Sequence, residues 1–273
     1  MRSSPPAWAT GWTDTNGDGK QTTGEVGIVG ATVTLIGGGA DGLINGIGDT
    51  TATTTTGADG IYNFAGLTPG QQYQVQFSAP AGTVFTGQNV GANGFDTVDS
   101  GRRCHHRQDA DRHAGPRRAQ PDAGRGGYAP AKLSGYVYKD VGNDGVRNSE
   151  PAIAGVVLTL TGTNGLGQPV TATATTDANG FYQFINLAPG TYTVSEAQPA
   201  GFIDGKDTVG STGGSNAVND VLSGITLGSG ANSVENNFGE IVTASLGDRL
   251  GPTPTATASR RPVRSASSAP LSR

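Results

Sequence analysis

The sequence predicts an all-β protein with two tandem antiparallel β-sandwich domains, a disordered linker and a disordered tail. One motif occurs twice, over residues 57–70 and 177–190, and each copy follows an acidic, glycine-containing loop. Because a repeated unit must bury its own apolar face, the duplication indicates two domains of one kind. The chain also has 45 glycines and 15 prolines, and its short apolar runs are rich in threonine, which favours strands and turns over helices.

The duplication divides the chain into five segments. We expect sandwich repeats over residues 11–100 and 132–241, an arginine-rich linker over 101–131, and disordered ends over 1–10 and 242–273. The first repeat stops near Val98, at a point where the second continues through Val209 into a further strand. We therefore expect the first repeat to lack its closing strand and to expose a sheet edge that other chains can pair with.

The individual strands are predicted from alternating apolar residues and from the turn residues between them. In the second repeat they cover residues 132–138, 153–160, 169–176, 181–184, 190–196, 225–227 and 233–238. The first repeat has the same order over residues 30–36, 50–56, 61–64 and 72–77. Gly60 and Gly180 stand where a tight hairpin turn requires a positive φ, so their predicted role is geometric.

The arginine-rich linker differs in composition from the acidic repeats around it. Three interpretations are open. The first is that the segment is translated out of frame, since a shifted frame turns arginine codons into codons for small and apolar residues. The second is a disordered linker, and the third is a basic patch for an anionic surface. The first is favoured, so we expect no nucleic-acid partner and no packed structure over residues 101–128.

The acidic loop of the first repeat has the ligand pattern of a twelve-position calcium loop. Side-chain oxygens stand at positions 1, 3, 5 and 12, on Asp14, Asn16, Asp18 and Glu25. Lys20 would supply a backbone carbonyl at position 7. A strand and not a helix follows, so the loop would sit on a β scaffold. The expected cofactor is Ca²⁺; the alternative is a turn rich in Asp and Asn that holds no metal.

The loop of the second repeat has a poorer ligand set. Asp140, Asp144 and Glu150 remain, and Val146 would supply the backbone carbonyl. Gly142 has no side-chain oxygen, unless a register shift brings Asn143 into its place, and the segment before Glu150 is shorter. The sequence therefore predicts weaker calcium binding at this loop.

Composition argues against several classes of protein. A single cysteine excludes an internal disulfide framework, and no apolar run is long enough for a transmembrane helix, so no membrane insertion is expected. The first residues lack the apolar segment of a secretory signal. All three histidines lie in the arginine-rich segment, and no nucleophile stands beside a base, so an enzyme is not expected.

Several motifs occur in a fixed order in the second repeat, over residues 138–148, 176–184, 187–194, 196–202 and 236–239. Together they resemble the B-type repeats of bacterial serine-aspartate-repeat (SD-repeat) surface adhesins, within the broader group of collagen-adhesin B-type and carboxypeptidase-regulatory-like sandwiches. The resemblance covers residues 14–99 and 132–240 and implies a prealbumin-like sandwich. It also implies an extracellular protein, on the bacterial surface or secreted, of which this chain is a fragment without signal peptide and wall anchor.

The resemblance implies a function as well. Calcium-stabilised repeats would act as a structural, adhesive spacer behind a region that binds a host or matrix protein or a surface polysaccharide. The alternative is a carbohydrate-binding sandwich, in which Tyr62 and Phe64, or Tyr182 and Phe184, would stack on sugars; inward-pointing rings would exclude it.

Related adhesin modules can form a Lys–Asn isopeptide cross-link assisted by a buried acid. The candidates here are Lys139, Asn236 or Asn237, and Glu196. Lys139 directly precedes the second acidic loop, where a charge partner suffices to explain it, and we expect no cross-link.

Overall fold

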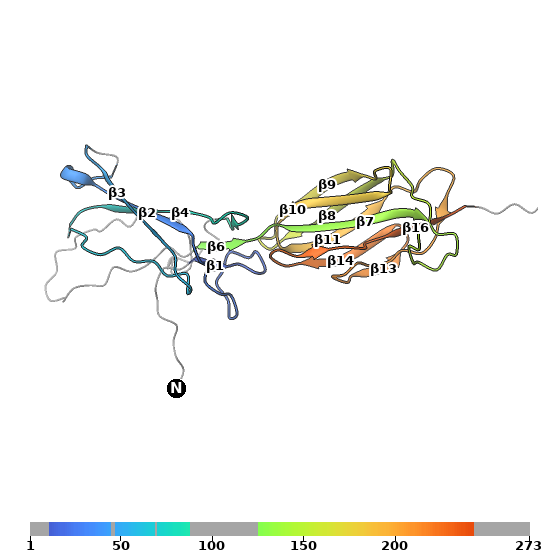
Figure 1. Cartoon of the computed structure of the whole chain (residues 1–273), viewed down its shortest axis with the longest axis horizontal. Coiled ribbons are helices and arrows are strands. Elements are labelled where there is room, and N and C mark those ends of the chain that lie inside the picture. Colours follow the sequence, from blue (N-terminus) through green and yellow to red (C-terminus); the bar gives the residue numbers. More distant parts are fainter. Residues whose placement is uncertain (1–10, 45–46, 69, 88–124, 243–273) are drawn as a thin grey trace, which may run out of the picture. The chain divides into compact units, whose positions relative to one another are not determined.

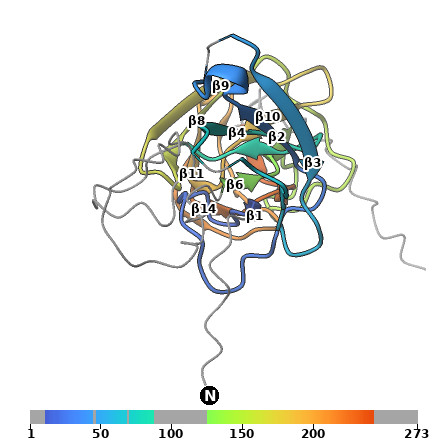
Figure 2. The ribbon, with the colours of Figure 1, turned by 90° about the vertical axis from the view of Figure 1, so that its left-hand side faces the viewer.

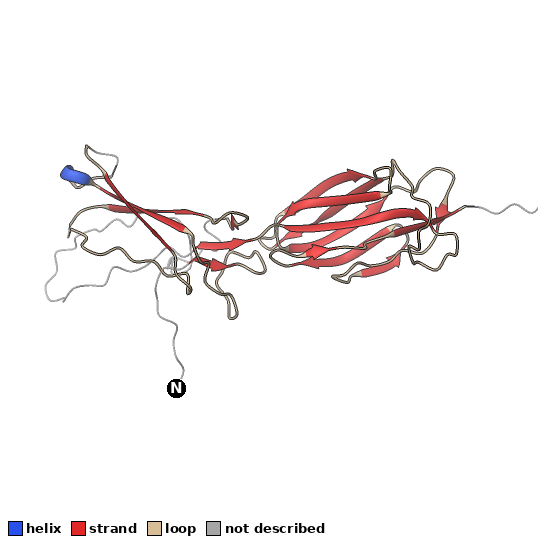
Figure 3. Ribbon diagram, in the orientation of Figure 1, coloured by secondary structure: helices blue, strands red, loops and turns tan. Residues whose placement is uncertain are grey.

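The structure is a computed structural model that describes residues 11–44, 47–68, 70–87 and 125–242 (Figure 1). Strands dominate these ranges, and the short 3₁₀ helix η1 (Gly39–Asp41) is the one helix found in them (Figure 3). None of the helical structure in the described ranges has the length and apolar character of a membrane span. The predicted all-β fold class is confirmed.

The first repeat contains two three-stranded sheets (Figures 1 and 2). The first is antiparallel and has the order β3 (Thr50–Thr55), β2 (Thr32–Gly37), β4 (Tyr73–Ser78). The other has the order β1 (Gly11–Thr13), β6 (Arg125–Tyr128), β5 (Val84–Phe85). Burial alternates along β2, so that Val33 and Leu35 face the core, as expected for a sheet with one solvated face.

Strand β6 corrects two predictions about the first repeat. We expected residues 101–131 to be a linker and the closing strand to be missing, but Arg125–Tyr128 pairs in parallel with β1 and in antiparallel with β5. Two glycines at its centre let β6 approach its neighbours, because a Cβ on Gly126 would lie 3.1 Å from the Trp12 ring. Residues 88–124, which hold most of the arginine-rich segment, are outside the described ranges.

The second repeat is a sandwich of two five-stranded sheets. One sheet has the order β10 (Phe181–Leu187), β7 (Ala131–Lys139), β16 (Phe238–Ile241), β12 (Ile203–Asp204), with β15 (Asn232–Ser233) also beside β7. The other has the order β13 (Ser215–Val218), β14 (Val221–Leu227), β11 (Gly190–Glu196), β8 (Val157–Asn164), β9 (Pro169–Thr175). In both repeats the closing strand runs parallel to the opening strand, β6 with β1 and β16 with β7.

The core of the second repeat lies between its two sheets. Buried apolar side chains come from both sheets, with Leu133 and Val137 on β7 and Tyr192 and Val194 on β11. Because successive side chains of a strand point to opposite faces, the next inward position on β11 belongs to Glu196. A carboxylate therefore stands where the alternation calls for an apolar residue.

The repeated motif contributes the same contacts in both copies. Thr176 Oγ1 is buried, accepts a hydrogen bond from Val156 N at 2.9 Å and donates one to Ile153 O at 2.9 Å. Thr56 makes the corresponding pair of hydrogen bonds in the first repeat. Gly180 has a φ of 71°, and a Cβ there would lie 2.3 Å from a backbone oxygen of β7, so the turn requires glycine as predicted.

The paired aromatic residues of the second repeat point inward. Tyr182 and Phe184 are buried, their ring centroids lie 5.9 Å apart, and the Tyr182 hydroxyl donates to Asn236 O. Rings in this position offer no face to a sugar. In the first repeat residues 61–64 do not form the predicted strand, and Tyr62 packs edge-on against Phe64 and Phe77.

Candidate cation sites

The acidic loop of the first repeat folds around the carboxylate of Asp14, which is fully buried. Asp14 Oδ1 accepts a hydrogen bond from Asp18 N at 3.1 Å, and Oδ2 accepts from Gly19 N at 2.9 Å and from Thr86 Oγ1 at 2.5 Å. Asp18 in turn caps Lys20 N at 2.8 Å. Backbone amides therefore fix the carboxylates of this loop at its first and fifth positions.

The other two predicted ligands of this loop are also held locally. Asn16 Oδ1 accepts from Asp18 N at 3.1 Å, and its Nδ2 donates to Asp18 Oδ2 at 3.0 Å. Glu25 folds back onto the start of the loop, where its Oε1 accepts from Thr15 N at 2.9 Å. The last position of the predicted calcium loop thus lies next to the first.

The loop of the second repeat has the same hydrogen-bond pattern. Asp140, also fully buried, accepts from Asp144 N at 3.1 Å and from Gly145 N at 2.7 Å. Asp144 Oδ1 caps Val146 N at 2.8 Å, and Glu150 Oε1 accepts from Val141 N at 2.8 Å. The shorter segment before Glu150 leaves these contacts unchanged.

This pattern fixes the register of the second loop. Asp140 and Asp144 take the places of Asp14 and Asp18, so Gly142 stands opposite Asn16 and the register shift that would have used Asn143 does not occur. A Cβ built on Gly142 would have the Asp144 and Asp140 carboxylates as its nearest neighbours, at 3.8–3.9 Å. The second loop lacks one side-chain oxygen at a position that faces its carboxylates.

The chemistry of both loops suits Ca²⁺, because every candidate ligand is a carboxylate, amide or backbone oxygen. In the structure most of these oxygens accept hydrogen bonds from backbone amides, whereas Glu150 Oε2 is buried without a partner. The group of three carboxylates whose oxygens could hold one ion lies elsewhere in the described part of the chain, at Glu196, Asp220 and Glu240.

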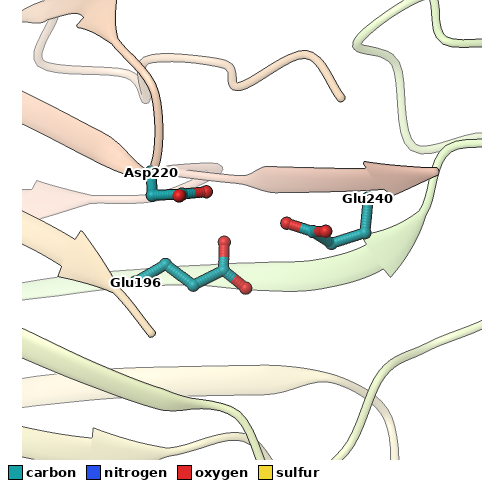
Figure 4. Close-up of side chains that lie close together, drawn as sticks. All are labelled: Glu196, Asp220 and Glu240. Carbon is teal, nitrogen blue, oxygen red and sulfur yellow. The ribbon is translucent and has the colours of Figure 1, made fainter. Parts of the chain in front are cut away.

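This second group, which we call the acid cluster, was missed by the sequence analysis. Glu196 ends β11, Asp220 lies in the turn between β13 and β14, and Glu240 lies on β16. One carboxylate oxygen from each lies within 4.8 Å of those from the others, and Figure 4 shows the side chains pointing toward one another. The signal was present in the sequence, since strand alternation puts Glu196 on the face of Val194 and Glu240 on the face of Phe238.

Burial and mutual repulsion both disfavour charge in the acid cluster. Desolvation, and then the neighbouring Glu240, raise the pKa of Glu196 from 4.5 to about 9. Desolvation likewise raises the pKa of Glu240 to about 7, and the pKa of the adjacent Asp207 to about 7 with help from Asp204. Each charged neighbour that shifts these pKa values is another carboxylate.

The residues considered for an isopeptide cross-link have other partners. Asn236 Nδ2 donates to a backbone carbonyl of β7 at 3.0 Å, and Asn237 Nδ2 donates to a carboxylate two residues before it at 2.8 Å. The charged groups around Glu196 are carboxylates, and Lys139 is not among them. A cross-linking acid would have to lie beside the lysine.

Comparison with known protein families gives two matches to one domain. The model of the SdrD B-like domain matches residues 9–124 and again residues 131–239. The chain belongs to the SdrD B-like domain family. The two SdrD B-like copies correspond to the two repeats seen in the sequence.

Two curated proteins are similar to most of this chain. Serine-aspartate repeat-containing protein F of Staphylococcus epidermidis is 35% identical over 241 residues, which cover 87% of this chain and 13% of that protein. Serine-aspartate repeat-containing protein D of Staphylococcus aureus (strain Newman) is 34% identical over 193 residues, 70% of this chain and 13% of the relative. The chain thus spans about an eighth of the length of these two relatives.

Two solved pilin structures show a weaker likeness. The minor pilin GBS52 of Streptococcus agalactiae is 15% identical with a TM-score of 0.31, covering 84% of this chain and 90% of the pilin. The shaft pilin SpaA of Lactobacillus rhamnosus GG is 15% identical with a TM-score of 0.30, covering 88% and 98%.

Proposed function

We propose that the two SdrD B-like repeats are a structural spacer of a bacterial cell-surface or secreted protein, and that calcium stabilises their acidic loops. One observation carries the proposal: the acidic loop has the same hydrogen-bond pattern in both repeats, around a carboxylate that is fully buried. A bound cation would offset the cost of burying such a carboxylate away from water.

The position of the loops in the fold suits a spacer. The first loop links β1, in one sheet, to β2, in the other, and the second loop links β7 to β8 in the same way. A cation held there would fix the crossover between the two sheets of each sandwich. Such a cross-brace opposes sliding of one sheet past the other when the chain is pulled.

In this role the repeats hold a separate binding region away from the cell surface. That region, and not the repeats, would contact a host or matrix protein or a surface polysaccharide. The inward-pointing rings of Tyr182 and Phe184 agree with this division, because the second repeat offers no stacking platform there. No reaction is assigned to the repeats.

Single-molecule force spectroscopy tests the spacer role. The full chain is pulled from its two ends in millimolar Ca²⁺ and again in EDTA, and we expect the unfolding forces of the repeats to be higher with calcium. Extracellular calcium modules bind at about 10⁻⁴–10⁻³ M, so millimolar calcium is the relevant condition. Equal forces in the two solutions would refute the calcium-braced spacer.

A matched pair of variants assigns the effect to the loops. Gly142→Asn adds the missing side-chain oxygen to the second loop, where the Cβ has room and faces two carboxylates, and should increase that repeat's calcium response. Asn16→Gly makes the first loop resemble the second and should weaken its response. If neither exchange changes the calcium dependence, the loops are not the calcium sites.

A further inference from the structure

The acid cluster is largely buried and is not a patch of surface charge. Glu240 is fully buried and Glu196 is 9% exposed, and Figure 4 shows their carboxylates pointing toward each other. Asp220 is only partly buried and lies in a turn, where its φ is 56°. The cluster therefore has two buried members and one that is partly exposed to solvent.

The buried carboxylates lack partners. Neither oxygen of Glu196 has a hydrogen-bond partner, and Glu240 Oε1 and Asp220 Oδ1 have none either. Glu240 Oε2 accepts a hydrogen bond from Gln198 Nε2, which orients that carboxylate but leaves its other oxygen unsatisfied. Buried polar side chains almost always have a partner, so several unpartnered oxygens within 4.8 Å of one another are placed to bind a ligand.

Protons can relieve part of the repulsion in this cluster, since a protonated carboxyl group can donate to a neighbouring carboxylate, as in the side-chain hydrogen bond between Asp204 and Asp220. Glu196 has no such hydrogen bond. A cation, by contrast, binds carboxylate oxygens that do not touch each other.

The spacing of the oxygens is compatible with Ca²⁺. Calcium takes oxygen ligands at 2.3–2.6 Å, so two oxygens on one Ca²⁺ are at most about 5 Å apart. The oxygens of the acid cluster, within 4.8 Å of one another, meet that limit. Magnesium ligands at 2.0–2.1 Å are at most about 4.2 Å apart and need near-octahedral geometry, so Ca²⁺ tolerates a wider range of oxygen positions within the 4.8 Å limit.

We propose that Glu196, Asp220 and Glu240 form a calcium site in the second repeat, separate from its acidic loop. Asp204 and Asp207 lie close enough to add negative charge around the ion. Glu196 and Asp220 belong to one sheet and Glu240 to the other, so the ion would join the two sheets through side chains. This proposal goes beyond the calcium loops and does not depend on them.

Calcium titration of the full chain tests the site. Isothermal titration calorimetry counts the Ca²⁺ bound by the wild type and by the double variant Glu196→Gln/Glu240→Gln, whose amides keep the size of the side chains but remove their charge. We expect the double variant to bind one Ca²⁺ fewer per chain. When the titration is repeated with Mg²⁺ at the same concentrations, the wild type and the double variant should bind the same number of ions.

Two controls keep the result interpretable. Glu235→Gln makes the same exchange on a carboxylate of the same repeat outside the acid cluster, and should leave the number of ions unchanged. In EDTA the double variant should melt at or above the wild-type temperature, because it no longer buries repelling carboxylates, and this shows that lost binding is not lost folding. If it fails to fold, Asp220→Asn, at the partly exposed member of the cluster, replaces it.

The outcome separates this site from the loops. If the double variant binds as many calcium ions as the wild type, the acid cluster is not a calcium site, while the proposal for the loops is unaffected. If Asp14→Asn and Asp140→Asn change nothing but the double variant loses an ion, the acid cluster stands and the loop proposal fails.

Discussion

At the scale of single residues, the second repeat buries several polar groups, some with hydrogen-bond partners and some without. The Thr176 hydroxyl is fully hydrogen-bonded and can be understood as part of the fold. Glu196 occupies an equally buried position without a partner. The first group stabilises the folded state, and the second destabilises it unless a cation is bound.

The titration of the acid cluster predicts how stability depends on pH in EDTA. The pKa of Glu196 is raised from 4.5 to about 9 and that of Asp207 from 3.8 to about 7, so the folded state holds protons that the unfolded state has lost. Stability without cation is therefore greatest below the unfolded pKa values and falls as the pH rises through about 7 to about 9.

Calorimetric melts of the full chain in EDTA between about pH 5 and 9 measure this decline. In the Glu196→Gln/Glu240→Gln variant the decline should be smaller, because two of the titrating groups are gone. A wild-type profile that stays level over this range, or that rises, contradicts the burial of these carboxylates.

A second residue-scale prediction concerns Thr176. Thr176→Val keeps the shape but leaves the Val156 N–H and the Ile153 carbonyl without their partner, which should cost about 1–3 kcal/mol of unfolding free energy. Thr175→Val, at an exposed position of β9, should stay within about 0.5 kcal/mol of the wild type. Urea denaturation of the three proteins compares them, and equal losses for both variants would contradict the assigned role.

At the scale of elements, alternation and turn chemistry predicted the strands that have long neighbours. Strand β11 has the predicted bounds, β9 ends one residue earlier, β7 is one residue longer at each end, and β8 lies four residues later than predicted. The prediction failed over residues 61–64, because their counterpart β10 pairs with the nine-residue β7 whereas β1 has three residues. It missed β6 because that strand is built from Arg-Gly-Gly-Tyr, which has no apolar alternation.

The acid cluster illustrates a different limit of the sequence. Calcium loops are recognised because their ligands are close in sequence. Glu196, Asp220 and Glu240 come together only after β11 has paired with β14 in one sheet and β16 with β7 in the other. Alternation places each glutamate on an inward face, but only the sheet order shows that the two faces meet. The loops were predicted residue by residue, and the cluster required the fold.

The glycine turn before β10 gives an element-scale prediction. Gly180→Ala adds a Cβ that would lie 2.3 Å from the Val137 carbonyl, at a φ of 71°. Gly155→Ala has a similar φ of 79° but meets nothing within 4 Å, so it should cost only about 1–2 kcal/mol of backbone strain. Gly180→Ala should cost clearly more. Equal melting temperatures for the two variants would show that the turn adjusts freely.

The pairing of β7 with β16 bears on the cross-link as well. Asn236 and Asn237 use their side-chain nitrogens for hydrogen bonds, and Lys139 is not among the groups around Glu196. We predict that no isopeptide forms. Intact-mass spectrometry of the full chain measures this directly, since the cross-link expels ammonia; a mass lower by one ammonia than the sequence requires would prove the prediction wrong.

At the scale of the whole molecule, the two repeats share one frame but differ in ligand supply. The first loop has Asn16 where the second has Gly142, so calcium should stabilise the first repeat more. Binding to the folded state alone adds RT ln(1 + [Ca²⁺]/Kd), about 2.7 kcal/mol at a hundredfold excess over Kd. Calorimetric melts of the wild type and of Asp14→Ala, each with calcium and with EDTA, measure this gain. If the calcium response of Asp14→Ala equals that of the wild type, the site assigned to the first loop is wrong.

The parallel pairing of first and last strands has a consequence for synthesis on the ribosome. Strand β1 starts at Gly11, but its partner β6 starts only at Arg125. The sheet that contains β1 therefore cannot be completed until all the residues between these two strands have been synthesised. Domains generally fold as units during translation, at about 5–20 residues per second. Throughout that interval Trp12 on β1 is not yet packed against β6. The nascent chain is therefore most accessible to proteases, and most able to pair with other chains, before the second repeat emerges from the ribosome.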